Sequence, residues 1–583
     1  KDLSAYDSLC DAAYLRAKED YLMGINFSRL LTLKYGNSIS NFLQTKYSVV
    51  SVGRVMTCVL GMVVRREREI RDFVKTPFYR VLSTIDAQGH TFEGEWRAVK
   101  GSRYFESYDL YKENGFKERK KAEELIQYLQ TPDDESVNVA GIQGQSGLNC
   151  RIESIEKKKE KKNPPLLYNL AELQNDCSKR FKISPDETLR IVQELYEKKL
   201  VTYPRTDAVQ EMYEQKLVTY PRTDARVLST AVAKEITRNL NGLSKYPMAA
   251  PYMQDILNFG SYKTLAKTRY VNDKQITDHY AIIPTGQGLN ALSTVSSTAK
   301  GVYDLIVRRF LSIFYPPAVY QKVAIVTKIK EESFFSSFKV LAEEGYLKVA
   351  GIPKKKASQT ATKDSSNGNS ENNNNDTNDE AGLDSSNQSL DTGLFEVIKS
   401  LKKGAVLQVR ALDIKEGETS PPKRYNSGSM ILAMENAGQL IEDEELRAQI
   451  KGSGIGTSAT RAEILKKLVN IKYLALNKKT QVITPTLQGE MIYDVVDHSI
   501  RSLLNPELTA SWEKGLNYVA EGSITSDEYM RKLDHFITSR TVGVKGLNNQ
   551  YQLRACYEKA AGFYPSVNSN KTTGRTKTGS RSK

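Results

Sequence analysis

The chain is long and basic. Its 583 residues include 84 Lys and Arg against 69 Asp and Glu, which gives a formal net charge of +15. A chain of this length is expected to fold as several packed units rather than as one domain. The positive surplus favours a polyanionic partner such as nucleic acid, although charge describes solubility and nonspecific association better than function.

Two classes of protein are disfavoured from the start. The best apolar stretch, VVSVGRVMTCVLGMVV, is interrupted by Arg54, so no membrane-spanning helix is predicted. The five cysteines are widely spaced, odd in number and form no CxxC pair or Cys/His cluster, which favours a reducing cytoplasm over a disulfide framework. No secretory signal opens the chain, and because it begins with Lys1 instead of Met, we expect a segment upstream of it.

The first half of the chain predicts helices followed by strands. Residues 1–72 carry apolar positions at spacings of three and four, as in AAYLRAKEDYLMGINFSRLLTL, which is typical of amphipathic helices. Between 73 and 160 the pattern alternates and contains glycine and aromatic residues, so strands and turns are predicted. The run EKKKEKK near the end of this stretch is interpreted as a solvated face.

Residues 161–319 are predicted to be helical again, with a clear helix start. Ser184 is expected to cap that helix while Glu187 reaches back to the cap, and Pro185 occupies the first helical position, where its missing N–H is harmless. Strands are predicted in AVYQKVAIVTKIK, SFKVLAEEGYLKV and GAVLQVRALDIKEG. An Asn-, Ser- and Asp-rich insertion at 357–391 is predicted to be disordered, a helical block is expected from about 427 to 540, and the end after 565 is predicted to be a basic flexible arm.

One stretch occurs twice. Residues 192–208 recur at 209–225 with two differences, so LVTYPRTDA appears in duplicate. A tyrosine phenol has a reference pKa near 10, so its attack on a phosphodiester requires nearby positive charge or a base. The arginine two residues further on supplies charge, and in an extended segment both side chains lie on the same side. The guanidinium can then hold a phosphate oxygen while the phenol faces phosphorus, although a Tyr-Pro-Arg stretch alone is equally a rigid turn.

Further motifs place this stretch in a family. They occur in the order SVGRVMT (51–57), LVTYPRTDA, DHYAIIPTG (278–286), YDLIVRRFL (303–311), TSPPKRYN (419–426), GIGTSATRAEIL (454–465) and LTASWEKGL (508–516). Together they resemble type IA DNA topoisomerases, above all the bacterial topoisomerase III branch, over roughly residues 5–540.

The resemblance implies a toroidal, multidomain α/β enzyme. Such an enzyme cuts one DNA strand through a 5′-phosphotyrosine bond, passes another strand and reseals the break without ATP, and the chain has no GxxxxGK[ST] loop. The implied substrates are single-stranded and negatively supercoiled DNA, which are relaxed or decatenated. The implied segments are a helical base (1–72 and 419–540), a β-strand arch (73–160 and 320–418), a tyrosine domain (161–319) and a basic C-terminal tail (541–583).

The implied catalytic residues are a tyrosine, its arginine and a histidine. Either Tyr203 with Arg205 or Tyr220 with Arg222 would act, because the family needs one such pair. His279 matches the active-site histidine, which would contact the scissile phosphate or its neighbour; a lone histidine is more often structural. The repeat is therefore interpreted as a tandem duplication, with a sequence assembly artefact as the alternative. Upstream context favours the first copy and downstream context the second, so the choice stays open.

The implied DNA contacts lie outside that motif. Arg54 matches a single-strand contact of the family and would otherwise be a surface arginine. In GSGIGTSATRAEIL, backbone amides at a helix N-terminus would bind phosphate, with Thr457 or Ser458 as the cap and Arg461 as a further contact; a plain capped helix is the alternative.

Several positions depart from the family pattern. Met56 and Cys58 replace Gln and Pro of GRVQTP, Tyr280 replaces His, and Ser458 replaces Pro, and Met56 puts a polar contact to DNA in doubt. The family's N-terminal metal-binding domain, with a catalytic Glu and an acidic DxD pair for Mg²⁺, finds no match, since the chain contains no DxD.

The unmatched metal-binding domain affects the activity expected of this chain alone. The chain is expected to bind DNA and cleave it poorly, with Mg²⁺ bound mainly by the missing domain. The alternative is a noncatalytic single-stranded DNA clamp, whereas a tyrosine recombinase would need several Arg and His in an arrangement that the sequence lacks.

Overall fold

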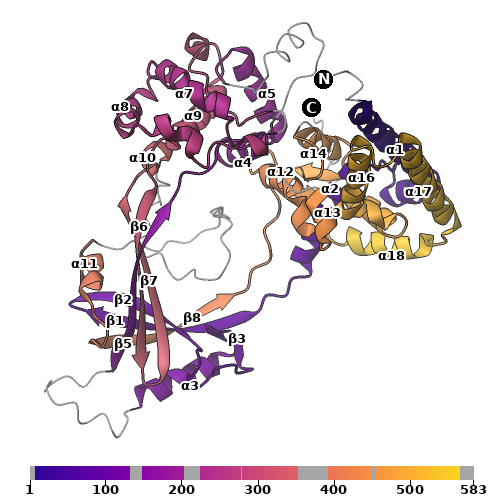
Figure 1. Ribbon diagram of the computed structural model, residues 1–583. Helices are drawn as coiled ribbons and strands as arrows, with labels where there is room; N and C mark the ends of the chain where they lie inside the picture. Colours follow the sequence, from indigo (N-terminus) through magenta and orange to yellow (C-terminus); the bar gives the residue numbers. More distant parts are fainter. Residues whose placement is uncertain are drawn as a thin grey trace, which may run out of the picture. The chain divides into compact units, whose positions relative to one another are not determined.

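The fold is seen in a computed structural model, which describes residues 7–131, 148–201, 223–276, 279–351, 392–449, 454–458 and 460–564. The chain forms two compact units (Figure 1). We call residues 1–73, 166–310 and 422–583 the helical unit, and residues 74–165 and 311–421 the sheet unit. The chain therefore enters and leaves each unit more than once. The assignment of its segments to a base, an arch and a tyrosine domain stays a prediction.

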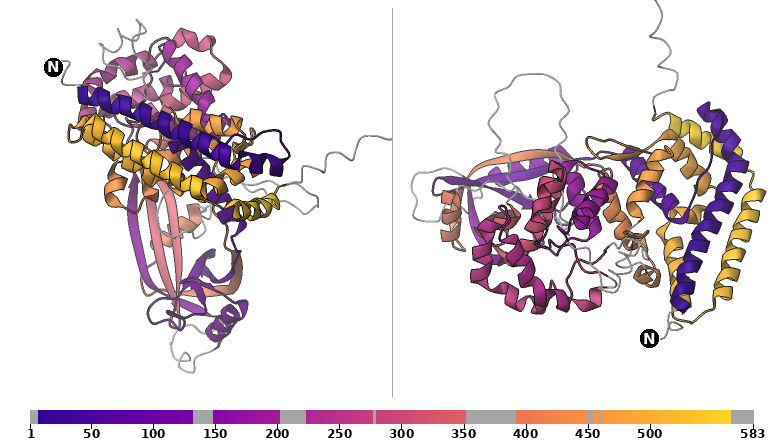
Figure 2. Two further views of the ribbon diagram at one scale, coloured as in Figure 1. Left: turned by 90° about the vertical axis from the view of Figure 1, so that its right-hand side faces the viewer. Right: turned by 90° about the horizontal axis from the view of Figure 1, so that it is seen from above.

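The helical unit begins with two long helices. They are α1 (Asp7–Leu43) and α2 (Arg54–Arg71), which confirms the helices predicted for residues 1–72. Their apolar faces join one core, in which α1 buries a residue at every fourth position from Leu15 to Ile39. Figure 2 shows α1 lying alongside α17 (Ser526–Gly546), whose apolar residues enter the same core.

The middle part of the helical unit carries the segments that flank the duplicated motif. Its helices are α4 (Leu170–Phe181), α5 (Pro185–Glu197), α7 (Thr230–Leu243), α8 (Ala250–Phe259) and α9 (Ser297–Ser312), with short 3₁₀ helices η3 (Ser261–Lys267), η4 (Asp273–Gln275) and η5 (Leu289–Ser293). The last residues of α9 already belong to the sheet unit, which resumes at 311.

The predicted cap of α5 is confirmed in one half. The hydroxyl of Ser184 accepts the N–H of Glu187 at 3.2 Å, but the Glu187 carboxylate pairs with Arg190 instead of returning to the cap. An arginine one turn along the helix offers this carboxylate an opposite charge, which a neutral cap N–H does not.

The last part of the helical unit closes on α2 and α4. Its elements are α12 (Ser427–Glu435), η6 (Ala437–Leu440), α13 (Glu444–Gln449), α14 (Arg461–Asn470), β9 (Leu474–Leu476), β10 (Ile483–Pro485), α15 (Leu487–Asp497), η7 (Arg501–Leu504), α16 (Pro506–Ala520), α17 and α18 (Gln550–Ala561). Helix α12 approaches α4 closely at Gly428, where a Cβ would lie 2.7 Å from the Cα of Asn175. The predicted tail from 541 is thus wrong up to 564, because α17 continues and α18 follows; the later residues lie outside the described part.

The sheet unit is built on antiparallel strands. They are β1 (Pro77–Ala87), β2 (His90–Arg97), β3 (Leu110–Lys112), β4 (Gly115–Phe116), β5 (Asn149–Lys162), β6 (Ala318–Ile329), β7 (Glu332–Glu343) and β8 (Val406–Glu418), in the order β2-β7-β6-β5-β8-β1-β4-β3. Because β2 also pairs with β1, six of these strands close into a ring. Helices α3 (Arg119–Gln130) and α11 (Thr392–Ser400) contribute to its core, and α10 (Leu347–Ala350) follows β7.

Two local predictions for the sheet unit need revision, and the one for the lysine-rich run is confirmed. Helix α3 lies in a stretch predicted to contain only strands and turns. The run EKKKEKK is solvent-exposed as predicted, yet it is part of β5, where pairing with β6 fixes an extended conformation. The predicted strand SFKVLAEEGYLKV begins five residues early as β7 and ends as α10. The insertion predicted at 357–391 lies outside the described residues.

Within the described residues, no helix is long and apolar enough to cross a bilayer. All five cysteines are free thiols. Burial raises the pKa of the Cys58, Cys150 and Cys177 thiols to about 12, so these side chains are packing residues rather than nucleophiles.

Candidate functional site

The described residues include the two ends of the duplicated motif but not its middle. Tyr203, Arg205, Tyr220 and Arg222 lie outside the described residues, so their predicted roles stay predictions. The described residues end at Val201 before these four residues and resume at Thr223 after them. Both ends belong to copies of LVTYPRTDA, the first to the upstream copy and the second to the downstream copy.

The upstream end is anchored on the segment that follows His279. Leu200 and Val201 are buried, and Val201 forms an antiparallel bridge with Pro284. The backbone N–H of Thr285 donates to the Leu200 carbonyl at 3.0 Å. The chain therefore enters the motif in an extended, hydrogen-bonded conformation two residues before Tyr203.

The downstream end is anchored beside His279 itself. Thr223 is buried, and its hydroxyl lies 3.5 Å from the backbone carbonyl of His279. The Thr223 carbonyl accepts the N–H of Leu170 at 3.3 Å, and the Asn169 side chain donates to the Asp224 carbonyl at 3.1 Å. The structure thus brings the half-buried His279 next to the residue that directly follows Arg222.

The two anchors use neighbouring residues of one segment. Val201 lies opposite Pro284, whereas the N–H of Ala281 donates to the Val227 carbonyl at 2.9 Å, so the pairing at Val201 does not continue to His279. Thr223 contacts His279 through its hydroxyl, and Thr206 is the same residue of the first copy. The first anchor therefore belongs to the copy with Tyr203 and the second to the copy with Tyr220.

An ion pair between a buried arginine and an exposed aspartate fixes the downstream end. Arg461, the first residue of α14, is 1% exposed, and its Nη1 lies 3.2 Å from Oδ1 of Asp224. Asn169 also donates to the Glu435 carboxylate at 2.6 Å. Burial raises the pKa of Glu435, although Arg461 acts in the opposite direction. A phosphate could reach this guanidinium only if the pair with Asp224 opened, so the predicted phosphate contact of Arg461 stays a prediction.

The cap of α14 differs from the prediction. The cap residue is Thr460, and neither Thr457 nor Ser458 caps the helix with its side chain. Instead, the Thr457 carbonyl accepts the N–H groups of Thr460 at 2.9 Å and Arg461 at 3.1 Å, forming a tight turn. Ser458 is buried, whereas Thr457 is exposed. The turn is possible because Gly456 adopts φ +67°, which an L side chain rarely does.

Arg54 is a buried cation and not a surface side chain. It is 5% exposed and lies within 3.2 Å of three carboxylates, those of Glu19, Asp20 and Glu513. Burial works against its charge, but the carboxylates outweigh this and raise the pKa of Arg54. Its predicted contact with single-stranded DNA stays a prediction, because in this structure its guanidinium is directed at carboxylates.

In the same cluster, the negative charge of the Glu19 carboxylate is not fully balanced by the arginines. Three carboxylates face Arg54 and Arg16, of which Arg16 pairs with Glu513. Burial raises the pKa of Glu19 to about 7, against the effects of Arg54 and of the Tyr529 hydroxyl, which donates to Glu19 at 2.7 Å. The pKa of Arg54 is decided by its carboxylate partners, taken together. The pKa of Glu19 is decided by desolvation, because Glu19 is fully buried.

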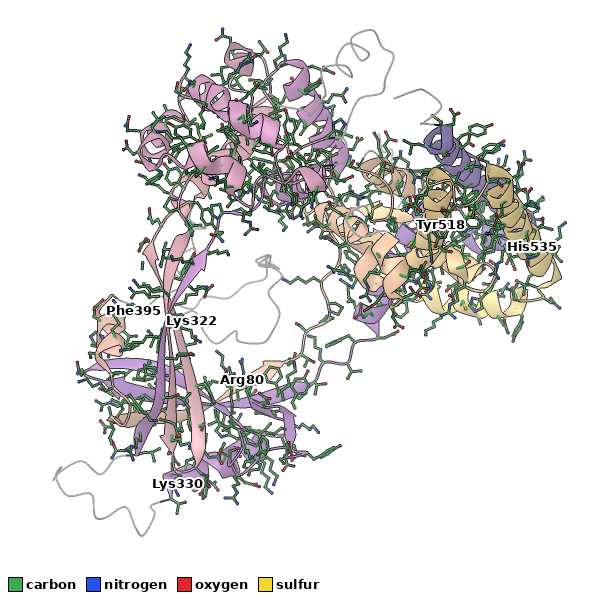
Figure 3. All side chains as sticks on the ribbon, viewed as in Figure 1. Arg80, Lys322, Lys330, Phe395, Tyr518 and His535 are labelled. Atoms are coloured by element: carbon green, nitrogen blue, oxygen red, sulfur yellow. The ribbon has the colours of Figure 1, made fainter. Side chains whose placement is uncertain are left out.

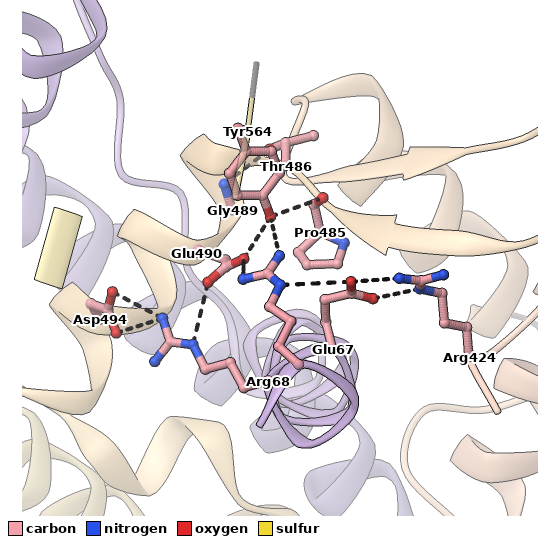
Figure 4. A network of polar contacts seen from close by, with 10 residues as sticks. Glu67, Arg68, Arg424, Pro485, Thr486, Gly489, Glu490, Asp494 and Tyr564 are labelled. Atoms are coloured by element: carbon pink, nitrogen blue, oxygen red, sulfur yellow. Dashed lines mark hydrogen bonds and ion pairs between the residues drawn. The ribbon is translucent and has the colours of Figure 1, made fainter. Parts of the chain in front are cut away.

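A second network stabilises the other end of α2 (Figure 4). Arg68 lies 2.9 Å from Asp494 and 3.3 Å from Glu490, both on α15. Glu67 of α2 accepts two hydrogen bonds from Arg424, and Tyr564 donates to Glu490 at 2.6 Å. The network connects α2 and α15 with the segment at Arg424 and with Tyr564, three residues after the end of α18.

Sequence reasoning missed the residues that hold these arginines. Asp224 and Glu513 stand inside motifs that were recognised, and a buried Arg461 or Arg54 requires a carboxylate nearby, so their partnership could have been sought there. Asn169, Glu435 and Glu19 carry no such signal, since their positions emerge only from the packing of α4, α12 and α1.

The described residues offer no metal site. Among the described residues, no group of three or more His, Cys, Asp and Glu side chains could hold an ion. The carboxylates that cluster in the helical unit, around Arg54 and Arg68, are engaged by arginines.

Comparison with known proteins gives a consistent picture. A family model described as DNA topoisomerase matches residues 4–209 and 207–531, two stretches that overlap at the junction between the copies. Each stretch contains one copy of TYPRTDA.

The relatives are bacterial. DNA topoisomerase 3 of Bacillus subtilis is 28% identical over 551 residues, covering 94% of this chain and 62% of the relative. DNA topoisomerase 3 of Bacillus licheniformis is 29% identical with the same coverage, and that of Shouchella clausii is 30% identical, covering 94% and 61%. The chain therefore spans about three-fifths of the length of these relatives.

Among solved structures, full-length topoisomerase I from Thermotoga maritima matches with a TM-score of 0.57 and 20% identity, covering 91% of this chain and 68% of that chain. At this identity the likeness shows a shared fold, as the motifs predicted.

Proposed function

The chain belongs to the DNA topoisomerase family, in its bacterial type IA branch, and on that premise we propose that it carries the strand-cleaving tyrosine of a topoisomerase III-like enzyme. The phenol oxygen of Tyr203 or Tyr220 would attack the scissile phosphorus. The bond from phosphorus to the 3′ oxygen would break, and the phenol proton would pass to that oxygen. The DNA would keep a free 3′ hydroxyl and a 5′-phosphotyrosine ester.

The reverse reaction would reseal the strand after another strand has passed. One phosphoester is exchanged for another, so the energy of the bond is kept and no ATP is required. Arg205 or Arg222, two residues after its tyrosine, would stabilise charge on the phosphate, and His279 would contact the same or the neighbouring phosphate.

The observation that carries this proposal is the common anchoring of both motif ends on residues 279–285. Val201 bridges to Pro284, and Thr223 lies against the His279 carbonyl. A single copy would run from Val201 to Thr206, the counterpart of Thr223. This arrangement would hold the tyrosine near His279, while Arg461 steadies the residues that follow through Asp224.

We propose that Mg²⁺ is held mainly by the metal-binding domain that finds no match in this sequence. Among the described residues, no cluster of ligands fits an ion. We also propose that the substrates are single-stranded and negatively supercoiled DNA and that the protein acts in the cytoplasm, in accord with its free thiols and positive charge.

The test is a search for the covalent adduct. The chain is incubated with a single-stranded oligonucleotide and Mg²⁺, with and without the metal-binding domain of a relative added in trans. The reaction is stopped with detergent, and the modified peptide is identified by mass spectrometry. We expect an adduct only in the arm that contains the metal-binding domain. It should be lost in Tyr203→Phe or in Tyr220→Phe, and always in the double variant.

Tyr196→Phe is the matched control, since Tyr196 precedes the same motif on α5 and should not be needed. An adduct that survives the double variant would reject both candidate tyrosines. Binding without any adduct in either arm would favour the noncatalytic single-stranded DNA clamp instead.

A further inference from the structure

The sheet unit carries a stacked pair of aromatic rings, of which Tyr111 is exposed and Phe78 is half-buried. Phe78 of β1 and Tyr111 of β3 lie with ring centroids 5.6 Å apart and an angle of 12° between their planes. Their positions on β1 and β3 oppose those of Tyr79 and Leu110, which contact the core, so the pair lies on the outer face. Tyr111 is 37% exposed. A buried ring would be explained by packing, but this one presents its surface to solvent.

The strands hold this pair rigidly. Phe78 faces Gly417 of β8 across the ladder, and a Cβ on Gly417 would lie 2.5 Å from the Phe78 ring. A Cβ on Gly115 of β4 would lie 3.4 Å from the same ring. The ring therefore packs closely over Gly417, where a side chain would displace it, and lies at ordinary contact distance from the place of a Cβ on Gly115.

Cations surround the pair. The Arg80 guanidinium lies 5.5 Å from the Phe78 centroid, and Lys112 Nζ lies 5.7 Å from the Tyr111 centroid. The position of Arg80 on the sheet unit can be followed in Figure 3. Lys415 of β8 stands directly opposite Arg80 in the antiparallel ladder, so both side chains lie on the same face. Lys112 and Lys415 are both exposed.

The neighbouring acidic residues are largely neutralised. Glu95 pairs with Arg80 at 3.0 Å, Glu416 with Arg119 at 2.6 Å and Glu418 with Lys75 at 3.7 Å. Within the described residues, Lys112 and Lys415 have no carboxylate partner. Asp413, the next residue of β8 on this face, marks the limit of the basic area. The face therefore combines stacked rings with two unneutralised positive charges.

We propose that this face, made of Phe78, Arg80, Tyr111, Lys112 and Lys415, binds a single strand of nucleic acid. An exposed aromatic ring stacks an unpaired base of any sequence, and adjacent cations hold the phosphates on either side. Bases in a duplex are already stacked on one another, so a double helix offers only its phosphates. The chemistry selects an unpaired strand, and it is shared by DNA and RNA.

This inference goes beyond the proposed cleavage site and does not depend on it. The five residues belong to the sheet unit, whereas the duplicated motif belongs to the helical unit. The strand would remain intact at the aromatic face, since none of its residues is offered as a nucleophile. Failure of phosphotyrosine formation would leave this proposal standing, and the reverse also holds.

The test is photochemical labelling of the whole chain. Oligonucleotides dT15 and rU15 carrying one 5-iodouracil base are irradiated at long wavelength with the chain, and the labelled residue is identified by mass spectrometry. We expect label on Phe78 or Tyr111, competed by an unlabelled strand and not by a duplex of equal length. Labelling by both dT15 and rU15 would show that the face accepts DNA and RNA, and labelling by one of them would show that it accepts that strand alone.

Tyr551 serves as an internal control, because it is 88% exposed on α18 but makes no aromatic contact within the described residues. Tyr111→Ala should weaken labelling of Phe78 about 5- to 150-fold, the equivalent of one lost base stack, whereas Tyr111→Phe should retain it. The double variant Lys112→Gln and Lys415→Gln should reduce the salt dependence of binding to this face by about 1.4 in the log–log slope.

Two results would overturn the proposal. Label on Tyr551 equal to that on Phe78 and Tyr111 would mean that exposure alone explains the reaction. Absence of label on the pair, together with Tyr111-dependent dimerisation of the chain, would make the face a contact between copies. Unchanged thermal unfolding of each variant confirms that the fold is intact.

Discussion

The ion pair between Arg461 and Asp224 allows a direct test of which copy of the repeat is held in the fold. Asp224 belongs to the second copy, and Asp207 occupies the same place in the first, outside the described residues. Asp224→Asn removes the negative charge while keeping the size of the side chain. Asp207→Asn makes the same change in an identical local sequence, so it is the matched control.

The magnitude follows from burial. Removing one partner of a fully buried ion pair costs about 3–5 kcal/mol, whereas exposed pairs contribute about 0–1 kcal/mol. Arg461 is 1% exposed at its side chain but Asp224 is 37% exposed, and the Glu435 carboxylate also acts on Arg461. We therefore expect a local cost of about 1–3 kcal/mol, which is about 5- to 150-fold in the equilibrium for local opening.

Hydrogen–deuterium exchange with mass spectrometry measures that opening locally. This matters because a chain with two compact units has no single two-state unfolding free energy. The amides to follow are those of Leu170 and Ala225, which donate to the Thr223 carbonyl and hydroxyl. Asp224→Asn should accelerate their exchange by the factor above, and Asp207→Asn should leave them unchanged.

The opposite pattern would show that the first copy is held. Acceleration only in the double variant would show that either aspartate can fill the place opposite Arg461. Either outcome would refute the reasoning that ties Arg461 to Asp224 alone.

Three further predictions concern stability. Folding raises the pKa of Glu19 from 4.5 to about 7, so folding binds a proton between these pH values and the stability of the fold falls as pH rises through them. Glu19→Gln keeps an acceptor for the Tyr529 hydroxyl and should remove up to about 3 kcal/mol of this pH-dependent loss of stability. Calorimetry should therefore show that the variant is more stable than the parent chain at pH 8 and equally stable at pH 4.5. Gly489→Ala should destabilise by at least about 1–3 kcal/mol, since its Cβ would lie 1.9 Å from the Tyr473 carbonyl, whereas Gly543→Ala on α17, with open space around it, should raise the unfolding temperature slightly. Tyr564→Phe should cost about 1–3 kcal/mol by removing a hydrogen bond to buried Glu490, and an unchanged melting temperature would argue against the docking of this residue.

Local patterns in the sequence predicted those elements whose stability is local. The helices α1 and α2 follow from apolar spacing, and the start of α5 follows from Ser184 and Pro185. The strand β5 could not be predicted from EKKKEKK, because lysine and glutamate have low strand propensity and β5 is extended through its pairing with β6. Tertiary hydrogen bonds decide such elements, and no pattern within the segment reveals them.

The candidate site was predictable in its residue types and less so in its partnerships. The motif around Arg461 pointed to a helix start beside phosphate, yet the structure shows its guanidinium buried against Asp224, far away in the sequence. Likewise, the motif at Arg54 did not reveal that Glu19, Asp20 and Glu513 converge on it. A motif specifies which charges are needed, and only the fold shows which other charges meet them.

The duplication itself should cost the fold little, and this can be tested by removing it. With Val201 and Thr223 both anchored, the link between them is 17 residues longer than a single copy would require. By loop-closure entropy, lengthening a link from about 5 to about 22 residues costs only about 1.3 kcal/mol. This is no more than the expected contribution of the ion pair at Asp224.

Deletion of residues 209–225 joins Ala208 to Arg226 and leaves one uninterrupted LVTYPRTDA. Thr206 should then take the place of Thr223 beside His279, and Asp207 the place of Asp224 opposite Arg461. We expect the deletion variant to unfold at the same temperature or slightly higher and to keep the slow exchange of the Leu170 amide. In that variant, Asp207→Asn should accelerate the exchange of this amide. If the deletion instead exposes that amide or unfolds the helical unit, the second copy contributes contacts that a single copy cannot replace.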